Sequence, residues 1–174
     1  KGYIQNLSQT IRERELELKK QKIQEIQESK QTVKSTALQN LSLINDVLES
    51  PDLPKVVGFR RFIPEFGERL ITRQIDQVKA LLSLQNRTLL KGQGTISDFE
   101  AKILQDSATS LGRELPEKDF RKELAKIRGV FANAAGVPSI VKITDPETGE
   151  SNTVSATREG INQALLDGLR VEYQ

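Results

Sequence analysis

A stretch without glycine or proline runs from Ile4 to Leu48, and it constrains the fold of this chain more than any other feature. Gln, Glu, Lys and Leu, which are good helix formers, dominate its composition. Because glycine and proline are the usual interruptions of helices, the stretch predicts one helix of about 45 residues, roughly 65 to 70 Å long. Ser50-Pro51 predicts its end, since proline lacks a backbone donor and disfavours helical geometry in the residue before it.

Apolar residues in the second half of this helix alternate at spacings of three and four, with Lys30 and Asn40 in the two remaining slots. This spacing is typical of a coiled coil. The predicted oligomerisation seam consists of Ile23, Ile26, Val33, Ala37, Ile44 and Val47. Upstream, a 3-4-4 spacing fits better, with Glu15 and Lys22 in the empty slots. Its apolar members are Ile4, Leu7, Ile11, Leu18 and Ile26. The pitch of the seam is therefore expected to change near its middle, as at a stutter.

The chain divides into four predicted parts: a long coiled-coil helix at 1–50, a proline-rich connector at 51–64, a helical hairpin or bundle at 65–136, and a small α+β module at 137–174. The connector is apolar and is expected to pack against something. In the bundle, amphipathic helices are predicted from about 64 to 90, 97 to 111 and 116 to 135. Ser97-Asp98-Phe99-Glu100 fits a capping box, while Pro116 and Gly136 mark the two ends of the last helix.

In the C-terminal module the helical pattern ends, and β-branched residues that alternate between apolar and polar positions begin. Strands are predicted at 140–144 and 151–154, separated by turn residues at 145–149. Thr157 is suited to cap a short helix that Gly168 stops, and residues 170–173 predict a final strand. The predicted fold class is thus mainly α, with a long N-terminal coiled-coil helix, a small helical bundle and a C-terminal ββαβ module.

The glycines of Lys91-Gly92-Gln93-Gly94 raise the question of a phosphate-binding loop. A Walker loop places its lysine after the glycines and follows a strand, whereas here the lysine comes first and a predicted helix precedes it. A dinucleotide fingerprint needs a third glycine where this chain has Ser97. Gly92 and Gly94 instead fit a helix end and a turn, so we predict a helix-turn hinge formed by Gly92, Gly94, Ser97 and Glu100.

Composition excludes several kinds of active site. The sequence has no cysteine and no histidine, which removes thiolate metal sites and histidine-based triads. The carboxylates near Asp145 lack the ligand spacing of a calcium loop and fit a solvated hairpin turn. Ser107, Thr109 and Ser110 have no histidine to activate them and fit helix contacts. We therefore predict no catalytic, cofactor-binding or metal site, and no enzyme.

The charge and hydropathy of the sequence indicate which kinds of partner it suits. Twenty-six basic and twenty-four acidic side chains give a net charge of +2 with interspersed signs, unlike the basic stripe of a nucleic-acid-binding surface. No apolar run approaches the roughly 18 to 20 residues of a membrane span. The polar run from Arg12 to Glu15 fits either a solvated face or charge pairs that set the register of a partner.

The part of the chain from about Leu53 to Phe131 resembles a segment of many tailed-bacteriophage virion proteins. The residues that carry this resemblance are the connector LPKVVGFRRFIPEFG, the helix end at 78–82, and the stretches LKGQGTISDFEAKILQDSATSL and LPEKDFRKELAKIRGVF. Similar proteins include tail, tape-measure-like and internal DNA-ejection proteins, in which the segment commonly lies near the C-terminal end. The shared positions are caps, glycines and core residues, so the resemblance implies no catalytic residue.

This resemblance implies a virion structural protein, localised to the phage particle, that docks to neighbouring virion proteins. Together with the 3/4 spacing of the long helix, it predicts a parallel homo-oligomeric coiled coil. Two alternatives stay open: the non-catalytic C-terminal region of a virion-associated peptidoglycan-degrading enzyme, and a module that contacts viral DNA, which the charge pattern does not support. The chain contains no methionine and begins Lys1-Gly2-Tyr3, so we expect a processed fragment or part of a longer polypeptide.

Overall fold

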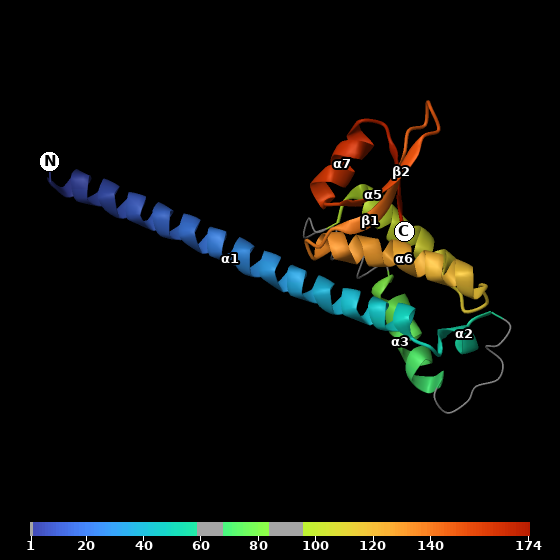
Figure 1. Cartoon of the computed structure of the whole chain (residues 1–174). Coiled ribbons are helices and arrows are strands. Elements are labelled where there is room, and N and C mark those ends of the chain that lie inside the picture. The colour runs from blue at the N-terminus through green and yellow to red at the C-terminus, as the bar shows by residue number, and fades with distance from the viewer. Residues whose placement is uncertain (1, 59–67, 84–95) are drawn as a thin grey trace. The chain divides into compact units, whose positions relative to one another are not determined.

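A computed structural model describes residues 2–58, 68–83 and 96–174 (Figure 1). The described chain is mainly helical, with one small antiparallel sheet of three strands near the C-terminus. Its contacts define two units, Lys1–Thr32 and Val33–Gln174. The predicted class is confirmed to this extent, while the coiled-coil character of the long helix stays a prediction.

Helix α1 runs from Gly2 to Glu49, as the stretch without glycine or proline predicts. All side chains from Gln9 to Thr32 are exposed. The last turn of α1 contains no basic residue. The last four carbonyl groups of a helix have no intrahelical hydrogen-bond donor. Arg121 supplies a donor from a distant helix, because its Nη1 donates a hydrogen bond to the carbonyl oxygen of Leu48.

The predicted seam divides between two environments. Ile23 and Ile26 are exposed, whereas Ala37, Ile44 and Val47 have no exposed surface and are buried within the chain itself. Val33, between the two groups, is partly exposed. The 3/4 spacing of the C-terminal half therefore marks an intramolecular contact face, and these three side chains are not available to a second copy in this structure.

The connector contains a short helix, α2, from Leu53 to Val56. Leu53, Val56 and Val57 are buried, so the expected packing of the connector is confirmed for this part; the rest of it lies outside the described residues. Two hydrogen bonds join it to the segment before the last bundle helix. Gly58 N–H donates to the carbonyl of Arg113 at 2.8 Å, and Arg113 Nε donates to the carbonyl of Val56 at 3.1 Å.

Among the residues that the structure describes, three helices form the rest of the bundle: α3 (Glu68–Leu81), α5 (Asp98–Ser110) and α6 (Glu117–Ala134). Helix α3 ends at Leu81, where the amides of Leu82 and Ser83 bond to carbonyls three residues back and tighten the last turn. The rest of the predicted helix, residues 84–90, lies outside the described residues. The buried faces of the three helices are apolar at three- and four-residue spacing. Their fully or almost fully buried side chains include Ile71, Ile75, Val78, Leu104, Phe120, Leu124 and Ile127.

Gly136 ends α6 as the sequence predicts. Its φ of 76° lies in the left-handed region, and the amides of Gly136 and Val137 donate to the carbonyls of Asn133 and Ala132. These are the two bonds of a Schellman motif, which glycine favours because it has no Cβ.

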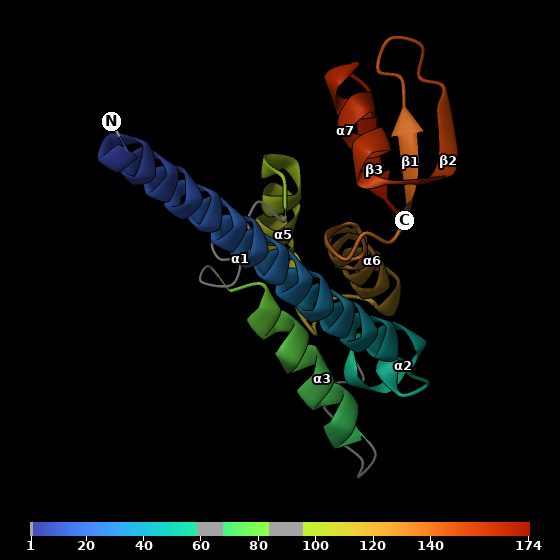
Figure 2. The same ribbon diagram turned by 90° about the vertical axis from the view of Figure 1, so that its left-hand side faces the viewer.

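The C-terminal module is a ββαβ unit with β1 (Ser139–Thr144), β2 (Ser151–Ala156), α7 (Arg158–Leu166) and β3 (Arg170–Tyr173). The strand order is β2-β1-β3, and β1 pairs antiparallel with both neighbours (Figure 2). Thr157 caps α7 as predicted, since its hydroxyl accepts from the amide of Gly160.

One face of the sheet is buried against helices along β1 and β3, whereas β2 is mostly exposed. Val141 pairs with Tyr173 in the β1–β3 register, and Ile143 pairs with Val171. Val141, Val171 and Tyr173 are buried, and residues of α6 and α7 belong to the same core. The alternation of exposed and buried side chains along β3 follows from the period of two along a strand.

Candidate functional site

Between residues 9 and 32 of α1, where the structure describes the side chains, five large apolar side chains are exposed, each with between 51% and 56% of its surface accessible. They are Ile11, Leu16, Leu18, Ile23 and Ile26. At 100° per residue they fall within an arc of about 160°, so they lie on one side of the helix, which we call the N-terminal apolar face. Contiguous exposed apolar surface of this kind marks an interaction site more often than scattered apolar residues do.

Charged residues lie both within this face and behind it. Glu15 and Lys22 lie among the apolar residues of this face, in the slots that the 3-4-4 pattern of apolar residues leaves empty. On the other side of the helix, Gln24 Nε2 donates to Glu28 Oε1 at 2.9 Å. The helix therefore has one mixed apolar and charged side and one polar side.

A buried carboxylate organises the second unit. Glu100 is only 2% exposed and forms the predicted capping box: its Oε2 accepts from the amide and hydroxyl of Ser97 at 2.6 and 2.8 Å. Oε2 also accepts from Arg158 Nη2, at the start of α7, at 3.2 Å. The same oxygen thus caps α5 and ties the C-terminal module to it. Gly92 and Gly94, the other members of the predicted hinge, lie outside the described residues.

A chain of hydrogen bonds continues from this carboxylate into the sheet. Tyr173 Oη lies 3.5 Å from Glu100 Oε1 and accepts from Asn133 Nδ2 at 2.6 Å. Ser139 Oγ lies 3.0 Å from both the carbonyl oxygen of Gly129 and Asn133 Oδ1, so its hydroxyl can donate to either. All four polar side chains, those of Glu100, Asn133, Ser139 and Tyr173, are almost fully buried.

This network suits a structural role. Burial raises the pKa of Tyr173 well above its ordinary value, and the charge of Glu100 raises it further, so the phenol stays protonated. Because Glu100 and Tyr173 have almost no exposed surface, they are not positioned to meet a substrate. The network joins α5, α6, α7, β1 and β3 and fixes their arrangement.

A second polar cluster, partly buried, joins α5 to α6. Ser107 donates to Glu123 Oε2 at 3.3 Å, and Lys126 donates to Oε1 at 2.6 Å. Ser110 Oγ lies 3.1 Å from Glu123 Oε2 and 2.9 Å from the carbonyl oxygen of Asp106, so its hydroxyl can donate to either. Burial raises the pKa of Glu123, but the hydrogen bond and charge of Lys126 and the two hydroxyls outweigh it, so the pKa lies below its ordinary value. A carboxylate held in its charged form is a weaker base, which agrees with the expectation that these serines serve helix contacts.

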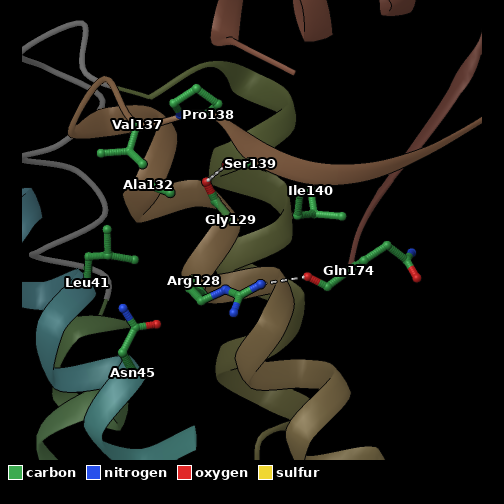
Figure 3. A pocket seen from close by; sticks show the side chains of 10 residues that line it. All are labelled: Leu41, Asn45, Arg128, Gly129, Ala132, Val137, Pro138, Ser139, Ile140 and Gln174. Carbon is green, nitrogen blue, oxygen red and sulfur yellow. Dashed lines mark hydrogen bonds between the residues drawn. The ribbon is translucent and has the colours of Figure 1, made fainter. Parts of the chain in front are cut away.

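A cavity of about 190 Å³ lies where α1, α6 and β1 meet (Figure 3). Leu41, Ala132 and Val137 contribute apolar walls, and Arg128 is the charged member of the lining. Arg128 Nη2 donates to the main-chain oxygen of Gln174 at 3.1 Å, which holds the end of the chain against α6. The lining contains no nucleophile paired with a base.

A groove of about 250 Å³ lies between α5, α6 and β3. Phe99, Ile103 and Val171 are among its apolar lining residues, and Lys122 and Glu123 are among its charged ones. The ring centroids of Phe99 and the buried Tyr173 are 6.4 Å apart. Opposite charges are thus interspersed along the groove, which gives no preference for the charge of a ligand.

In the part of the chain that the structure describes, no group of three or more Asp or Glu side chains is placed to hold a metal ion. Asp145 bonds locally instead: its Oδ1 accepts from the amide of Glu147 at 2.8 Å, which lowers the pKa of Asp145 and closes the hairpin turn. Within residues 2–58, 68–83 and 96–174, no helix is long and apolar enough to cross a membrane.

The sequence predicts Ser97 and Glu100 only as a helix cap and Tyr173 only as part of a strand, so the buried network that joins them does not follow from it. Glu100 and Tyr173 are 73 residues apart in sequence, and no local pattern connects them.

No protein-family model, curated protein or solved structure matches the chain.

Proposed function

We propose that this chain is a structural component of a tailed-phage virion, in the tail or the DNA-ejection machinery, that acts by self-association and by docking to neighbouring virion proteins. The observation that carries the proposal is the N-terminal apolar face, where five Ile and Leu side chains are each about half exposed along one side of the helix. Burying such side chains against a partner removes apolar surface from water, which is the main favourable term in protein association.

The virion setting is supported by the resemblance at 53–131. The positions that carry it have structural roles in this chain: Ser97 and Glu100 cap α5, and Phe120 and Leu124 belong to the core. The two polar clusters join secondary-structure elements to one another. We therefore propose a protein that works by assembly without bond chemistry.

The test is the oligomeric state of residues 1–174 measured by sedimentation over a wide range of concentrations. We expect reversible association. Leu18→Glu, which places a charge in the N-terminal apolar face, should abolish it. Gln31→Glu makes the same charge change on the opposite side of the same helix and should leave association unchanged.

Hydrogen exchange locates the interface independently. Amides of residues 9–32 should become more protected as protein concentration rises, because only associated helices shield them. A chain that stays monomeric at every concentration, with these amides unprotected, would rule out the proposal.

A further inference from the structure

Along the seam in the N-terminal apolar face, the spacing of residues is almost the same in both chain directions. Its positions are Ile11, Glu15, Leu18, Lys22 and Ile26, with successive spacings of four, three, four and four residues. Reversed, the spacings are four, four, three and four. Two such helices that run in opposite directions therefore align all five positions to within one residue, or about 1.5 Å.

We propose that two copies of the chain pair through this seam as antiparallel helices. The inference rests on the proposed function, because it specifies the partner and the direction of the self-association. Ile11 packs against Ile26 of the second copy, and Leu18 packs against its own equivalent. Glu15 faces Lys22 of the second copy, and the twofold symmetry repeats both the isoleucine contact and the charge pair.

The charges oppose the parallel arrangement that the sequence analysis predicts, and the antiparallel pair replaces it. In a parallel pair in register, each layer contains the same residue twice, so Glu15 meets a second Glu15 and Lys22 meets a second Lys22. Both layers would then hold like charges between apolar layers. Reversing one helix converts the two repulsive layers into two attractive ones without changing the apolar contacts in kind.

Residues beside the seam support the same direction. Arg14 and Glu25 differ by eleven residues, which is three turns of the helix, so they lie on the same flank of the seam. In an antiparallel pair the same flanks of the two helices meet, and Arg14 then lies near Glu25 of the second copy. This gives a second pair of opposite charges, again formed twice.

The structure also limits the extent of the seam. The downstream positions Ala37, Ile44 and Val47 are buried in the chain's own core. Pairing therefore uses mainly the first unit, where Ile11 and Ile26 are about 22 Å apart along the helix. A seam this short, with charged layers between the apolar ones, predicts a dimer whose formation depends on concentration.

Disulfide trapping tests the direction, and the sequence is suited to it because it contains no cysteine. Glu15→Cys and Lys22→Cys are prepared as separate full-length variants. Under mild oxidation, a mixture of the two should form the 15–22 disulfide rapidly, and each variant alone should cross-link slowly. Rapid 15–15 or 22–22 cross-links would instead establish a parallel pair and overturn this inference, while the proposed self-association would stand.

Charge reversal provides an independent measure. Glu15→Lys and Lys22→Glu each place like charges at two layers of the antiparallel dimer, so each should weaken dimerisation roughly tenfold or more. The double variant restores opposite charges and should return dimerisation to the wild-type level. Glu17→Lys, on the polar side of the helix, is the control and should have little effect.

The outcomes separate the two proposals. Single variants that dimerise like wild type would overturn the antiparallel pairing, because a parallel dimer exchanges one like-charged layer for another. A wild-type chain that does not associate at any concentration would overturn both this inference and the proposed function.

Discussion

Gly129 of α6 leaves the space that the ring of Tyr173 occupies. A Cβ atom added to this glycine would lie 2.1 Å from Tyr173 Cδ1 and 2.5 Å from Cγ. Two further contacts fix the position of the ring: its hydroxyl accepts from Asn133, one turn further along α6, at 2.6 Å, and the ring stacks on Phe99 of α5. The glycine therefore allows β3 to pack closely on α6.

Gly129→Ala should lower the free energy of unfolding. Alanine is favoured over glycine in a helix by about 1 kcal/mol. The overlap with a buried ring requires a shift of more than 1 Å, and overpacking of this kind costs about 1 to 3 kcal/mol or more. We expect the steric cost to win, with a net loss of about 1 to 2 kcal/mol in urea unfolding.

Gly160→Ala is the matched control for this substitution. Gly160 also lies in a helix, but its added Cβ would have its nearest neighbour at an ordinary 3.8 Å, Thr157 Oγ1. This variant should be as stable as wild type or more stable. Equal losses in both variants would show that the Gly129–Tyr173 contact is not the cause.

Tyr173→Phe should cost about 1 to 2 kcal/mol of stability, because Asn133 loses the acceptor of its hydrogen bond while staying buried. Asn133→Ala removes the other partner. If the two groups interact as the structure shows, the double variant should lose less stability than the sum of the single losses. Additive losses in this double-mutant cycle would contradict direct coupling.

The same tyrosine predicts a dependence on alkaline pH. Burial raises the pKa of Tyr173 above its ordinary value of 10, so above that pH the unfolded chain releases a proton that the folded chain retains. The contribution of Tyr173 is therefore fully present below pH 10 and is lost as pH rises further. Wild type and Tyr173→Phe should differ in stability at pH 8, and this difference should shrink above pH 10.

Glu123 predicts a dependence at acidic pH with the opposite sign. Its pKa lies below the ordinary value of 4.5, so as pH falls the unfolded chain binds a proton before the folded chain does. The stability that Glu123 contributes is thus present above pH 4.5 and is lost below it. The stability difference between wild type and Glu123→Gln should shrink on acidification, and Lys126→Gln should weaken this dependence.

Local sequence signals predicted the elements of this fold well and their long-range contacts poorly. The capping box at Ser97, the Thr157 cap and the end of α6 at Gly136 depend on residues within a few positions of one another, so their chemistry is visible in sequence. The contact between Glu100 and Tyr173 depends on how α5 meets β3, which no local pattern encodes.

The candidate interface shows the same limit. Spacings of three and four residues mark an apolar helix face, but they do not distinguish a face that meets a second copy from one that meets the chain's own core. Ile23 and Ile44 occupy equivalent positions of the predicted seam, yet the first is 56% exposed and the second has no exposed surface. Only the tertiary structure separates the two halves.

Substitution of these two residues provides the final prediction. Ile44→Ala should lower the free energy of unfolding by about 2 to 5 kcal/mol, because it removes buried methyl and methylene groups and leaves a cavity. Ile23→Ala removes a side chain that is 56% exposed, so it should change the stability of the monomer little and weaken self-association instead. Unfolding is measured at a concentration where the chain is monomeric, and association by sedimentation. If Ile44→Ala left stability unchanged and abolished association, the C-terminal half of the predicted seam would be an intermolecular contact after all.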